Sequence, residues 1–345
     1  MMKNIQETAI EIDDLNLLRA IAILLVVLRH CFAPFMSSWP VSTFYEYNIY
    51  ADITGKYIST ISMPLFVFIS GFLFSYLRNN LKKYPTYTIL LSKKTARLLR
   101  PYFVLAPLYI VVFIDINTTF DFLKQFWMGA GHLWFLLMIF TIFMLFYPLE
   151  SYFKKNPLKS FVAVVLLFCL YPGFSVLELY PISKAFQYLP FFFTGYFFHY
   201  NSIIISKLLK GKFWILFFLH SLLFIGSLFI PEFIQNGILK TLFRAFINLP
   251  LGLMSVSMLF LFFTIAKKRT TSNESPIIEN INITSYYIYI IHQPLLLWLF
   301  QLKFLQALPP LYVILLVFPS VILSSLILGN VLLKFHWGRR LIGAS

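Results

Sequence analysis

The sequence is poor in charge. Only 12% of its 345 residues are Asp, Glu, Lys or Arg, whereas 59% are hydrophobic. A soluble domain carries about 25% charged residues, so this composition excludes an ordinary soluble protein and predicts a polytopic membrane protein. Acidic residues are especially scarce, at 13 against 28 basic ones, which leaves a net charge of +15. Nucleic-acid-binding proteins also carry such an excess, so the positions of the basic residues must decide between the two explanations.

Cysteine and targeting segments are scarce too. Cys31 and Cys169 are the only two cysteines, and both lie in apolar runs, which excludes a disulfide framework. Neither belongs to a spacing typical of metal ligands, so we expect no metal. The first 18 residues are acidic and lack a basic stretch followed by a cleavage site, so we expect no cleavable signal peptide. Without long linkers or low-complexity segments, residues 1–345 are expected to form a single transmembrane domain with no appended soluble domain.

Long apolar runs are what the sequence does contain. Ten segments are long enough, or nearly long enough, to cross a bilayer as helices, and the third and sixth are the shortest. The predicted fold class is therefore an all-α polytopic membrane protein with about ten transmembrane helices. The segments cover residues 16–36, 57–77, 101–117, 133–150, 159–177, 185–200, 213–231, 242–266, 284–301 and 308–333.

The basic residues are unevenly distributed between the two sides that these segments define. With a cytoplasmic N-terminus, 20 of the 28 fall in cytoplasmic loops or termini, and five fall on the opposite side. This bias follows the positive-inside rule and predicts that both termini are cytoplasmic. It also explains the net charge without a nucleic-acid partner. The five are Lys56, Lys124, Lys184, Lys240 and Lys303, and the other three, Arg19, Arg29 and Arg244, lie in or at the ends of spans.

The first apolar segment, "LNLLRAIAILLVVLRHC" (Leu15–Cys31), contains three costly residues. A charged side chain at a helix centre costs roughly 2.5–3.5 kcal/mol on insertion scales, so Arg19, Arg29 and His30 need an explanation. Arg19 and His30 are 11 positions apart, which places them on one helix face about 16 Å apart along the axis. Arg19 can snorkel to the interface and His30 can be a hydrogen-bonded packing contact. An ionisable pair inside a span more often marks a functional site, and a neutral histidine is the usual general base near pH 7.

Five stretches, in this order along the chain, carry a resemblance to a known family. They are Arg19-x10-His30, "MPLFVFISGFLF" (Met63–Phe74), "KKTARLLRPYF" (Lys93–Phe103), "GHLWFLLMIF" (Gly131–Phe140) and "SYYIYIIHQPLL" (Ser285–Leu296). Together they resemble the acyltransferase-3 family of membrane O-acyltransferases. One position departs from the family pattern: many members have an acidic residue three positions before the arginine of the first motif, where this chain has Asn16.

The resemblance implies an enzyme that moves an acyl group, usually acetyl, from cytoplasmic acyl-CoA to a hydroxyl of a glycan or lipid-linked sugar. It implies that His30 acts as a base or takes the acyl group itself, assisted by Arg19. Arginine suits the phosphates of coenzyme A because its planar fork is always charged. The donor site is accordingly expected to contain Arg19, Arg97, Arg100 and Ser70, and the acceptor site His132, Trp134, His292 and Arg29.

Five of these residues also have a purely structural explanation. Arg97 and Arg100 can simply anchor the third span, and Ser70 can bond back to its own helix. Trp134 suits an interfacial aromatic belt. His292 precedes Pro294, which frees a backbone carbonyl that some neighbour must satisfy, and His292 can serve that arrangement or line a cavity.

Two other functions stay open on the sequence. A glycan or lipid exporter would equally have ten spans with buried charges, but would have no use for the arginines expected to hold coenzyme A. Succinyl transfer would require an extra cation near His30, for which Arg29 is the local choice. The resemblance implies a multi-pass protein of a bacterial cytoplasmic membrane whose partners are acetyl-CoA, a glycan or lipid-linked acceptor and membrane lipid.

Overall fold

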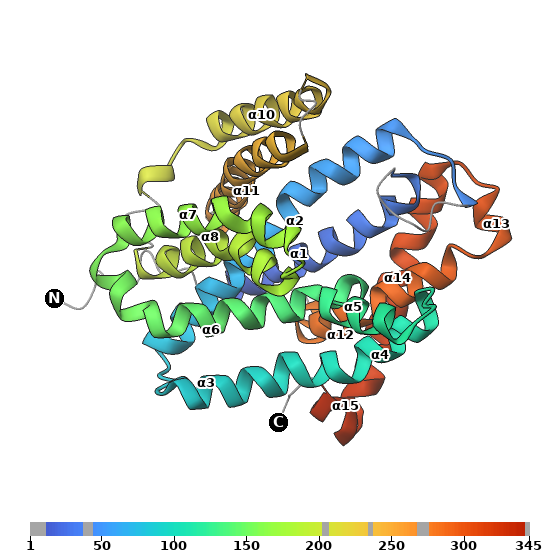
Figure 1. Cartoon of the computed structure of the whole chain (residues 1–345), viewed down its shortest axis with the longest axis horizontal. Helices are drawn as coiled ribbons and strands as arrows, with labels where there is room; N and C mark the ends of the chain where they lie inside the picture. The colour runs from blue at the N-terminus through green and yellow to red at the C-terminus, as the bar shows by residue number, and fades with distance from the viewer. Residues whose placement is uncertain (1–11, 37–43, 202–206, 234–236, 268–275, 342–345) are drawn as a thin grey trace. The chain divides into compact units, whose positions relative to one another are not determined.

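The structure is a computed structural model that describes residues 12–36, 44–201, 207–233, 237–267 and 276–341. It is 88% helical, and the residues described contain no strand, which confirms the all-α class (Figure 1). The longer helices are α1 (Ile12–Phe32), α2 (Ile49–Asn79), α4 (Arg100–Phe113), α5 (Thr119–Met128), α6 (Trp134–Lys155), α7 (Pro157–Val176), α8 (Tyr180–Tyr200), α10 (Phe213–Phe233), α11 (Gly237–Lys267), α12 (Pro276–Leu299) and α14 (Pro310–Lys334). The shorter ones are η1 (Ala33–Phe35), α3 (Tyr87–Lys94), η3 (Thr95–Leu99), η4 (Gly131–Leu133), α13 (Lys303–Gln306) and α15 (His336–Leu341).

Seven helices of the described chain are long and apolar enough to cross a membrane. They match seven of the ten predicted segments and cover Asn16–Phe35, Ile49–Asn79, Tyr87–Phe113, Gly131–Lys155, Pro157–Val176, Leu242–Leu261 and Pro310–Lys334. The segments predicted at 185–200 and 284–301 are helical, within α8 and α12, but these helices are not among the seven, and α10 has an apolar stretch of 17 residues. The total of ten and the cytoplasmic location of the termini stay predictions.

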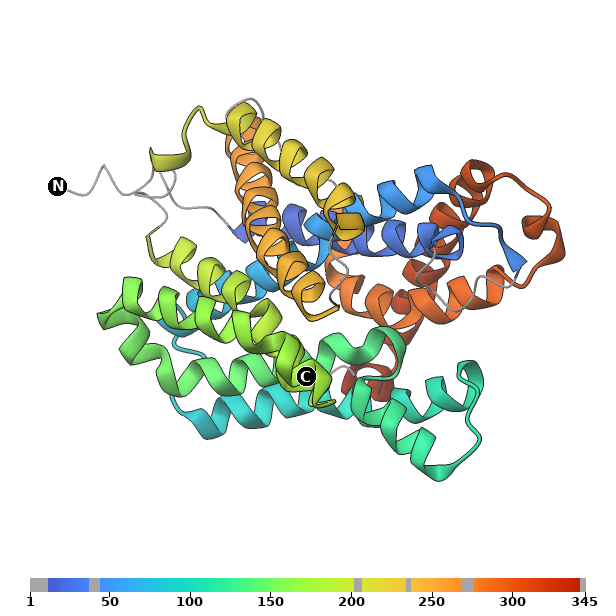
Figure 2. The same cartoon turned by 45° about the horizontal axis from the view of Figure 1, so that its top comes forward.

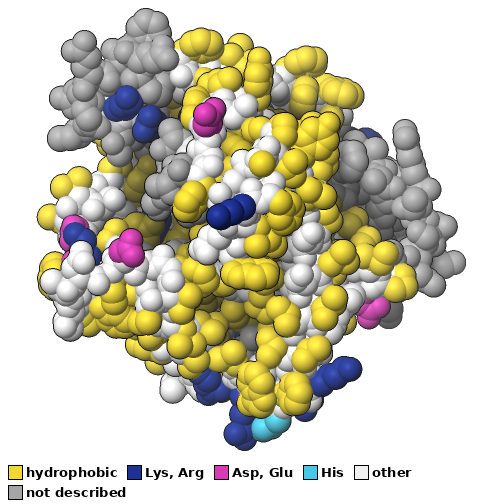
Figure 3. All heavy atoms as spheres, turned by 90° about the vertical axis from the view of Figure 1, so that its right-hand side faces the viewer, with side chains coloured by type: hydrophobic (Ala, Val, Ile, Leu, Met, Phe, Trp, Pro, Cys, Tyr) yellow, Lys and Arg dark blue, Asp and Glu magenta, His cyan; other side chains and the backbone are white. Residues whose placement is uncertain are grey.

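The surfaces of these helices are apolar on the outside as well as inside. Leu108, Val111 and Leu166 are exposed, and all belong to helices that can cross a membrane. Hydrophobic side chains cover much of the face drawn in Figure 3, and Lys and Arg side chains gather along its lower edge. A lipid environment accommodates such a surface.

The third span differs from its prediction because α3, η3 and α4 form one helix from Tyr87 to Phe113. Residues 87–100 were predicted to lie in a loop but are helical. The junction, η3, is a π-helical turn, and it precedes Pro101. Proline has no N–H to donate to the carbonyl of Arg97 four positions earlier, and the hydroxyl of Tyr286 from α12 donates to that carbonyl at 2.7 Å.

The described chain divides into two compact units. Unit 1 contains residues 63–87 and 141–267, in addition to the first residues of α1. In this unit α7 packs on α8 and α10 packs on α11, the latter pair lying side by side in Figures 1 and 2. Helices α2 and α8 cross closely, because a Cβ added at Gly71 would meet the carbonyl oxygen of Phe192 and one added at Gly195 would meet that of Phe68.

In unit 1, two of the basic residues that were assigned to cytoplasmic loops, Arg78 and Lys154, bind the same carboxylate. The buried carboxylate of Glu150 accepts hydrogen bonds from Arg78 at 2.9 Å and from the hydroxyl of Tyr196 at 2.5 Å, and Lys154 lies 3.1 Å from it. The Arg78 guanidinium stacks over the ring of Tyr147. These charges therefore join α2, α6 and α8 in addition to contributing to the bias across the membrane.

Unit 2 contains residues 19–62, 88–140 and 276–341 of the described chain, and all but one of the predicted site residues. Its helices α12 and α14 pack side by side (Figure 1). The hydroxyl of the buried Tyr287 donates to the carbonyl of Gly338 at 2.9 Å, which fixes the middle of α12 against α15.

Candidate active site

Three histidines of unit 2 lie together, although they come from distant parts of the sequence. The ring of His292, in α12, lies between those of His30, in α1, and His132, in η4. Its centroid is 5.1 Å from that of His30 and 5.1 Å from that of His132, with interplanar angles of 60° and 78°. The structure therefore joins the proposed base to two of the residues that were expected to bind the acceptor.

Backbone carbonyls determine which nitrogen of each ring carries the proton. His30 Nδ1 lies 2.7 Å from the carbonyl oxygen of Val26, one turn earlier in α1. His292 Nδ1 bonds in the same way to the carbonyls of Ile288 and Tyr289, at 3.0 and 2.7 Å. A carbonyl can only accept, so in both neutral rings Nδ1 holds the hydrogen and Nε2 has the lone pair. Nε2 is therefore the basic nitrogen of His30 and of His292.

The same reasoning gives His132 the opposite tautomer. Its Nε2–H donates to the carbonyl of Ile290 at 3.0 Å, which leaves the lone pair on Nδ1. This carbonyl is the one that Pro294, four positions later, cannot satisfy for lack of an N–H. The sequence predicted that a neighbour must satisfy it, and the neighbour is His132.

Helix α12 holds His132 by two more hydrogen bonds. The backbone N–H of His132 donates to Oε1 of Gln293 at 2.8 Å, and the hydroxyl of Tyr289 donates to the backbone carbonyl of His132. The ring of His132 also packs against the rings of Tyr109 and Tyr289. Because these bonds restrain both the main chain and the side chain of His132, its Nδ1 has a fixed position.

Two of the ring nitrogens that carry a lone pair are buried without a hydrogen-bond partner among the described residues. His292 is fully buried and His132 is 5% exposed, and among the described residues neither His292 Nε2 nor His132 Nδ1 has a hydrogen-bond partner. An unsatisfied buried polar atom costs about 1–3 kcal/mol. A bound molecule that carries hydroxyl donors would remove this cost, so the cluster is suited to bind an alcohol.

The arginines of the predicted site have separate surroundings. Arg29 is half-buried, and its Nε donates at 3.0 Å to the hydroxyl of Ser59, which itself donates to the carbonyl of Gly55. Arg19 and Arg97 lie close enough to repel each other, and Arg97 is exposed. Arg100 instead donates to the backbone carbonyl of Arg340 at 3.2 Å. The unit thus brings Arg19 and Arg97 together, while the π-helical turn at η3 takes Arg97 and Arg100 out of ordinary α-helical register.

Comparison with known families decides what kind of protein contains this cluster. The sequence model of the acyltransferase-3 family, described as an acyltransferase domain, matches residues 12–329. The chain belongs to the acyltransferase-3 family. No curated protein and no solved structure matches it. The match covers nearly the whole chain, including all five stretches that carried the resemblance, and it supports a membrane acyltransferase.

Two predicted residues of this acyltransferase have structural contacts of their own. Ser70 belongs to unit 1, where its hydroxyl donates to the carbonyl of Phe66 at 3.0 Å, the back-bonding alternative that the sequence left open. Trp134 is half-buried in unit 2, with its ring 6.3 Å from that of Phe135. The described part of the chain contains no group of three or more His, Cys, Asp or Glu side chains that could hold a metal ion.

Tyr289 and Gln293, which hold His132 in the acyltransferase, were not predicted from the sequence. Both lie within "SYYIYIIHQPLL", next to His292, so the stretch was recognised without the function of these two residues. Their contacts with His132 span 157 and 161 positions, and no local pattern indicates a pairing over that distance. The freed carbonyl ahead of Pro294 was the one available signal.

Proposed function

We propose that the chain is a membrane O-acyltransferase that moves an acetyl group from acetyl-CoA to a hydroxyl of a surface polysaccharide or lipid-linked glycan. The observation that carries the proposal is the histidine cluster, in which the Nδ1–H of His30 is bonded to a carbonyl, so its lone pair is on Nε2. Family membership supplies the reaction class, and the cluster supplies a base for it. Family membership also supports the proposal that the enzyme works in a bacterial cytoplasmic membrane.

In the direct route, His30 Nε2 takes the proton of the acceptor hydroxyl as its oxygen attacks the thioester carbonyl carbon. The carbon–sulfur bond breaks, and the proton passes from His30 to the departing sulfur, which leaves as free coenzyme A. In the alternative route, Nε2 attacks the thioester carbon and displaces the coenzyme A thiolate, and the acceptor oxygen then displaces Nε2 from that carbon while the hydroxyl proton goes to the thiolate. Both routes require the lone pair at Nε2, and His292 Nε2 can accept a hydrogen bond from a neighbouring hydroxyl of the same acceptor.

Arg19 and Arg97 are the residues that we assign to the phosphates of the donor, together with Arg100. Two mutually repelling guanidinium groups are stabilised when an anion lies between them. Arg19 and His30 are about 16 Å apart along α1, a distance that the extended arm of coenzyme A can bridge. On this arrangement the donor's charge stays near Arg19 while its thioester reaches His30.

The test is binding of acetyl-CoA to the purified protein in detergent. Wild type should bind saturably, and Arg97→Ala should weaken binding by about tenfold or more, as expected for the loss of a charge-assisted phosphate contact. Lys155→Ala removes one exposed positive charge elsewhere and serves as the matched control. A well-folded wild type that binds no acetyl-CoA would contradict the proposal and favour the exporter.

A further inference from the structure

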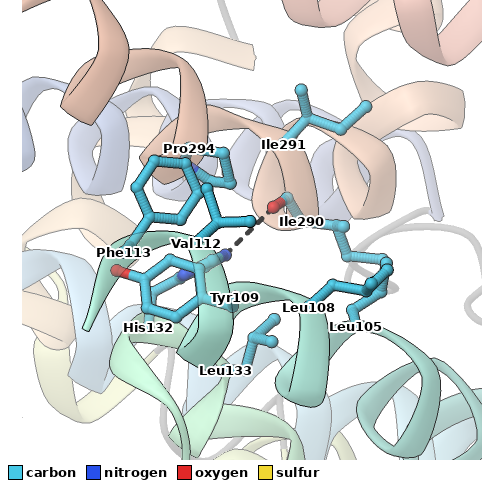
Figure 4. A pocket seen from close by; sticks show the side chains of 10 residues that line it. All are labelled: Leu105, Leu108, Tyr109, Val112, Phe113, His132, Leu133, Ile290, Ile291 and Pro294. Atoms are coloured by element: carbon cyan, nitrogen blue, oxygen red, sulfur yellow. Dashed lines mark hydrogen bonds between the residues drawn. The ribbon is translucent and has the colours of Figure 1, made fainter. Parts of the chain in front are cut away.

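Beside the histidine cluster, unit 2 contains a pocket of about 240 Å³ between α4, η4 and α12. Apart from Tyr109 and His132, its lining is aliphatic or aromatic, as with Leu108, Val112, Ile291 and Pro294 (Figure 4). Such a lining offers no set of polar groups for a sugar, whose hydroxyls would lose their hydrogen bonds to water. Its chemistry matches a hydrocarbon.

The pocket opens on the exposed apolar surface of a helix that can cross a membrane. Leu108 and Val112 line it and are 61% and 66% exposed, and both belong to the span Tyr87–Phe113. On the topology expected from the charge pattern, this part of α4 and the start of α6 lie in the outer half of the bilayer. A hydrocarbon chain can therefore enter from the outer leaflet without crossing water.

The inner wall of the pocket carries one polar atom that lacks a partner. His132 lines the pocket and is 5% exposed, and its Nδ1 accepts no hydrogen bond from the described residues. In Figure 4 the other nitrogen of its ring is bonded to the carbonyl of Ile290. From His132 the cluster continues through His292 to His30. The pocket is thus surrounded by hydrocarbon, and His132, whose Nδ1 is buried, forms part of its inner wall.

We propose that this pocket binds the hydrocarbon chain of the acceptor, which reaches the enzyme from the bilayer as a lipid-linked molecule, and that His132 Nδ1 accepts a hydrogen bond from a hydroxyl next to that chain. This inference rests on the proposed function and specifies the class of its acceptor. The acyl group of the donor is a poorer occupant, because two imidazoles, each 5.1 Å from the next, separate His30 from the pocket and an acetyl group does not span them.

The experiment uses the full-length protein in lipid vesicles and a ten-carbon alcohol that carries a photoactivatable diazirine. After illumination, mass spectrometry should find the label on peptides of α4 and α12. Val112→Trp fills the mouth of the pocket and should lower labelling by about tenfold or more. Val111→Trp is the matched control, since Val111 is the neighbouring residue, is 67% exposed and does not line the pocket. Equal labelling in both variants would reveal ordinary contact with bilayer lipid and overturn the proposal.

A second measurement distinguishes this proposal from the proposed function. Val112→Trp should leave acetyl-CoA binding unchanged while raising the KM for a lipid-linked acceptor. In the labelling experiment on the wild type, decanol should displace the label at lower concentration than decane, because only decanol can donate to His132. Pocket labelling that Val112→Trp removes, in a protein that binds no acetyl-CoA, would support the lipid site and contradict the transferase. Normal transfer by Val112→Trp, with unchanged KM, would overturn the lipid site and leave the transferase intact.

Discussion

The hydrogen bond from His30 to the carbonyl of Val26 leads to a prediction about a single residue. His30→Ala should reduce acetyl transfer by about 10²–10⁴-fold, the usual contribution of a general base, while the protein still inserts and binds acetyl-CoA. His30→Gln should be equally inactive, because an amide nitrogen donates but has no basic lone pair. Transfer is measured with radiolabelled acetyl-CoA in vesicles. Activity close to wild type in either variant would remove His30 from the mechanism.

Gln293 allows a test of a positioning residue. Its side chain is buried and accepts the backbone N–H of His132, so Gln293→Ala should leave that N–H unsatisfied. We expect a loss of about 1–3 kcal/mol in stability, visible as a lower unfolding temperature in detergent. Gln301→Ala changes an exposed glutamine and should have no effect. If Gln293→Ala unfolds at the same temperature as the control, the bond to His132 does not stabilise η4.

At this scale the sequence predicted the chemistry of the residues better than their partners. His30 and His292 were recognisable because ionisable groups inside apolar segments are costly and need a reason. The side chains that hold His132 were not recognisable, because Gln293 and Tyr289 bond to this residue across more than 150 positions of the sequence. The alternatives for Ser70 differ in the direction of its hydroxyl, which the sequence does not specify and which the structure gives as a bond to Phe66.

At the scale of the helices, the close crossing of α2 and α8 explains why the motif Met63–Phe74 contains a glycine, Gly71. A Cβ at Gly71 would overlap the carbonyl oxygen of Phe192, so only a glycine lets the two helices approach this closely. Gly71→Ala should destabilise the protein by about 1–3 kcal/mol, because the two backbones must separate. Gly226→Ala in α10 has open space around it and is the control. Equal unfolding temperatures for the two variants would contradict the tight crossing.

Apolar length predicted which segments are helices but not where each helix ends. The third span was predicted to begin at Pro101, where its apolar run starts after several basic residues. In the structure the helix continues back to Tyr87, since the π-helical turn and the hydroxyl of Tyr286 accommodate the proline. This hydrogen bond from α12 is a tertiary contact, so it cannot be predicted from the residues around Pro101 alone.

For the whole molecule, the number of crossings determines which loops share a side of the membrane. Between Lys155 and Lys303 the sequence predicts five spans, an odd number that puts these two residues on opposite sides. Only two of the seven long apolar helices lie between them, α7 and part of α11, and two crossings would put both residues on the same side. Whether the chain crosses five times or twice here depends on α8, α10 and α12. The buried positions of these helices include polar residues such as His220 and His292.

Labelling of single cysteines in intact cells shows whether the number of crossings between Lys155 and Lys303 is odd or even. After Cys31→Ala and Cys169→Ala remove the native thiols, Lys303→Cys should react with a membrane-impermeant maleimide added outside, because the charge pattern predicts an outer loop there. Lys155→Cys should react only after the cells are permeabilised. Both positions are exposed, so burial does not confound the comparison. Labelling of both from outside, or of neither, would mean an even number of crossings between them, and α12, with His292, would then need a different place relative to the bilayer.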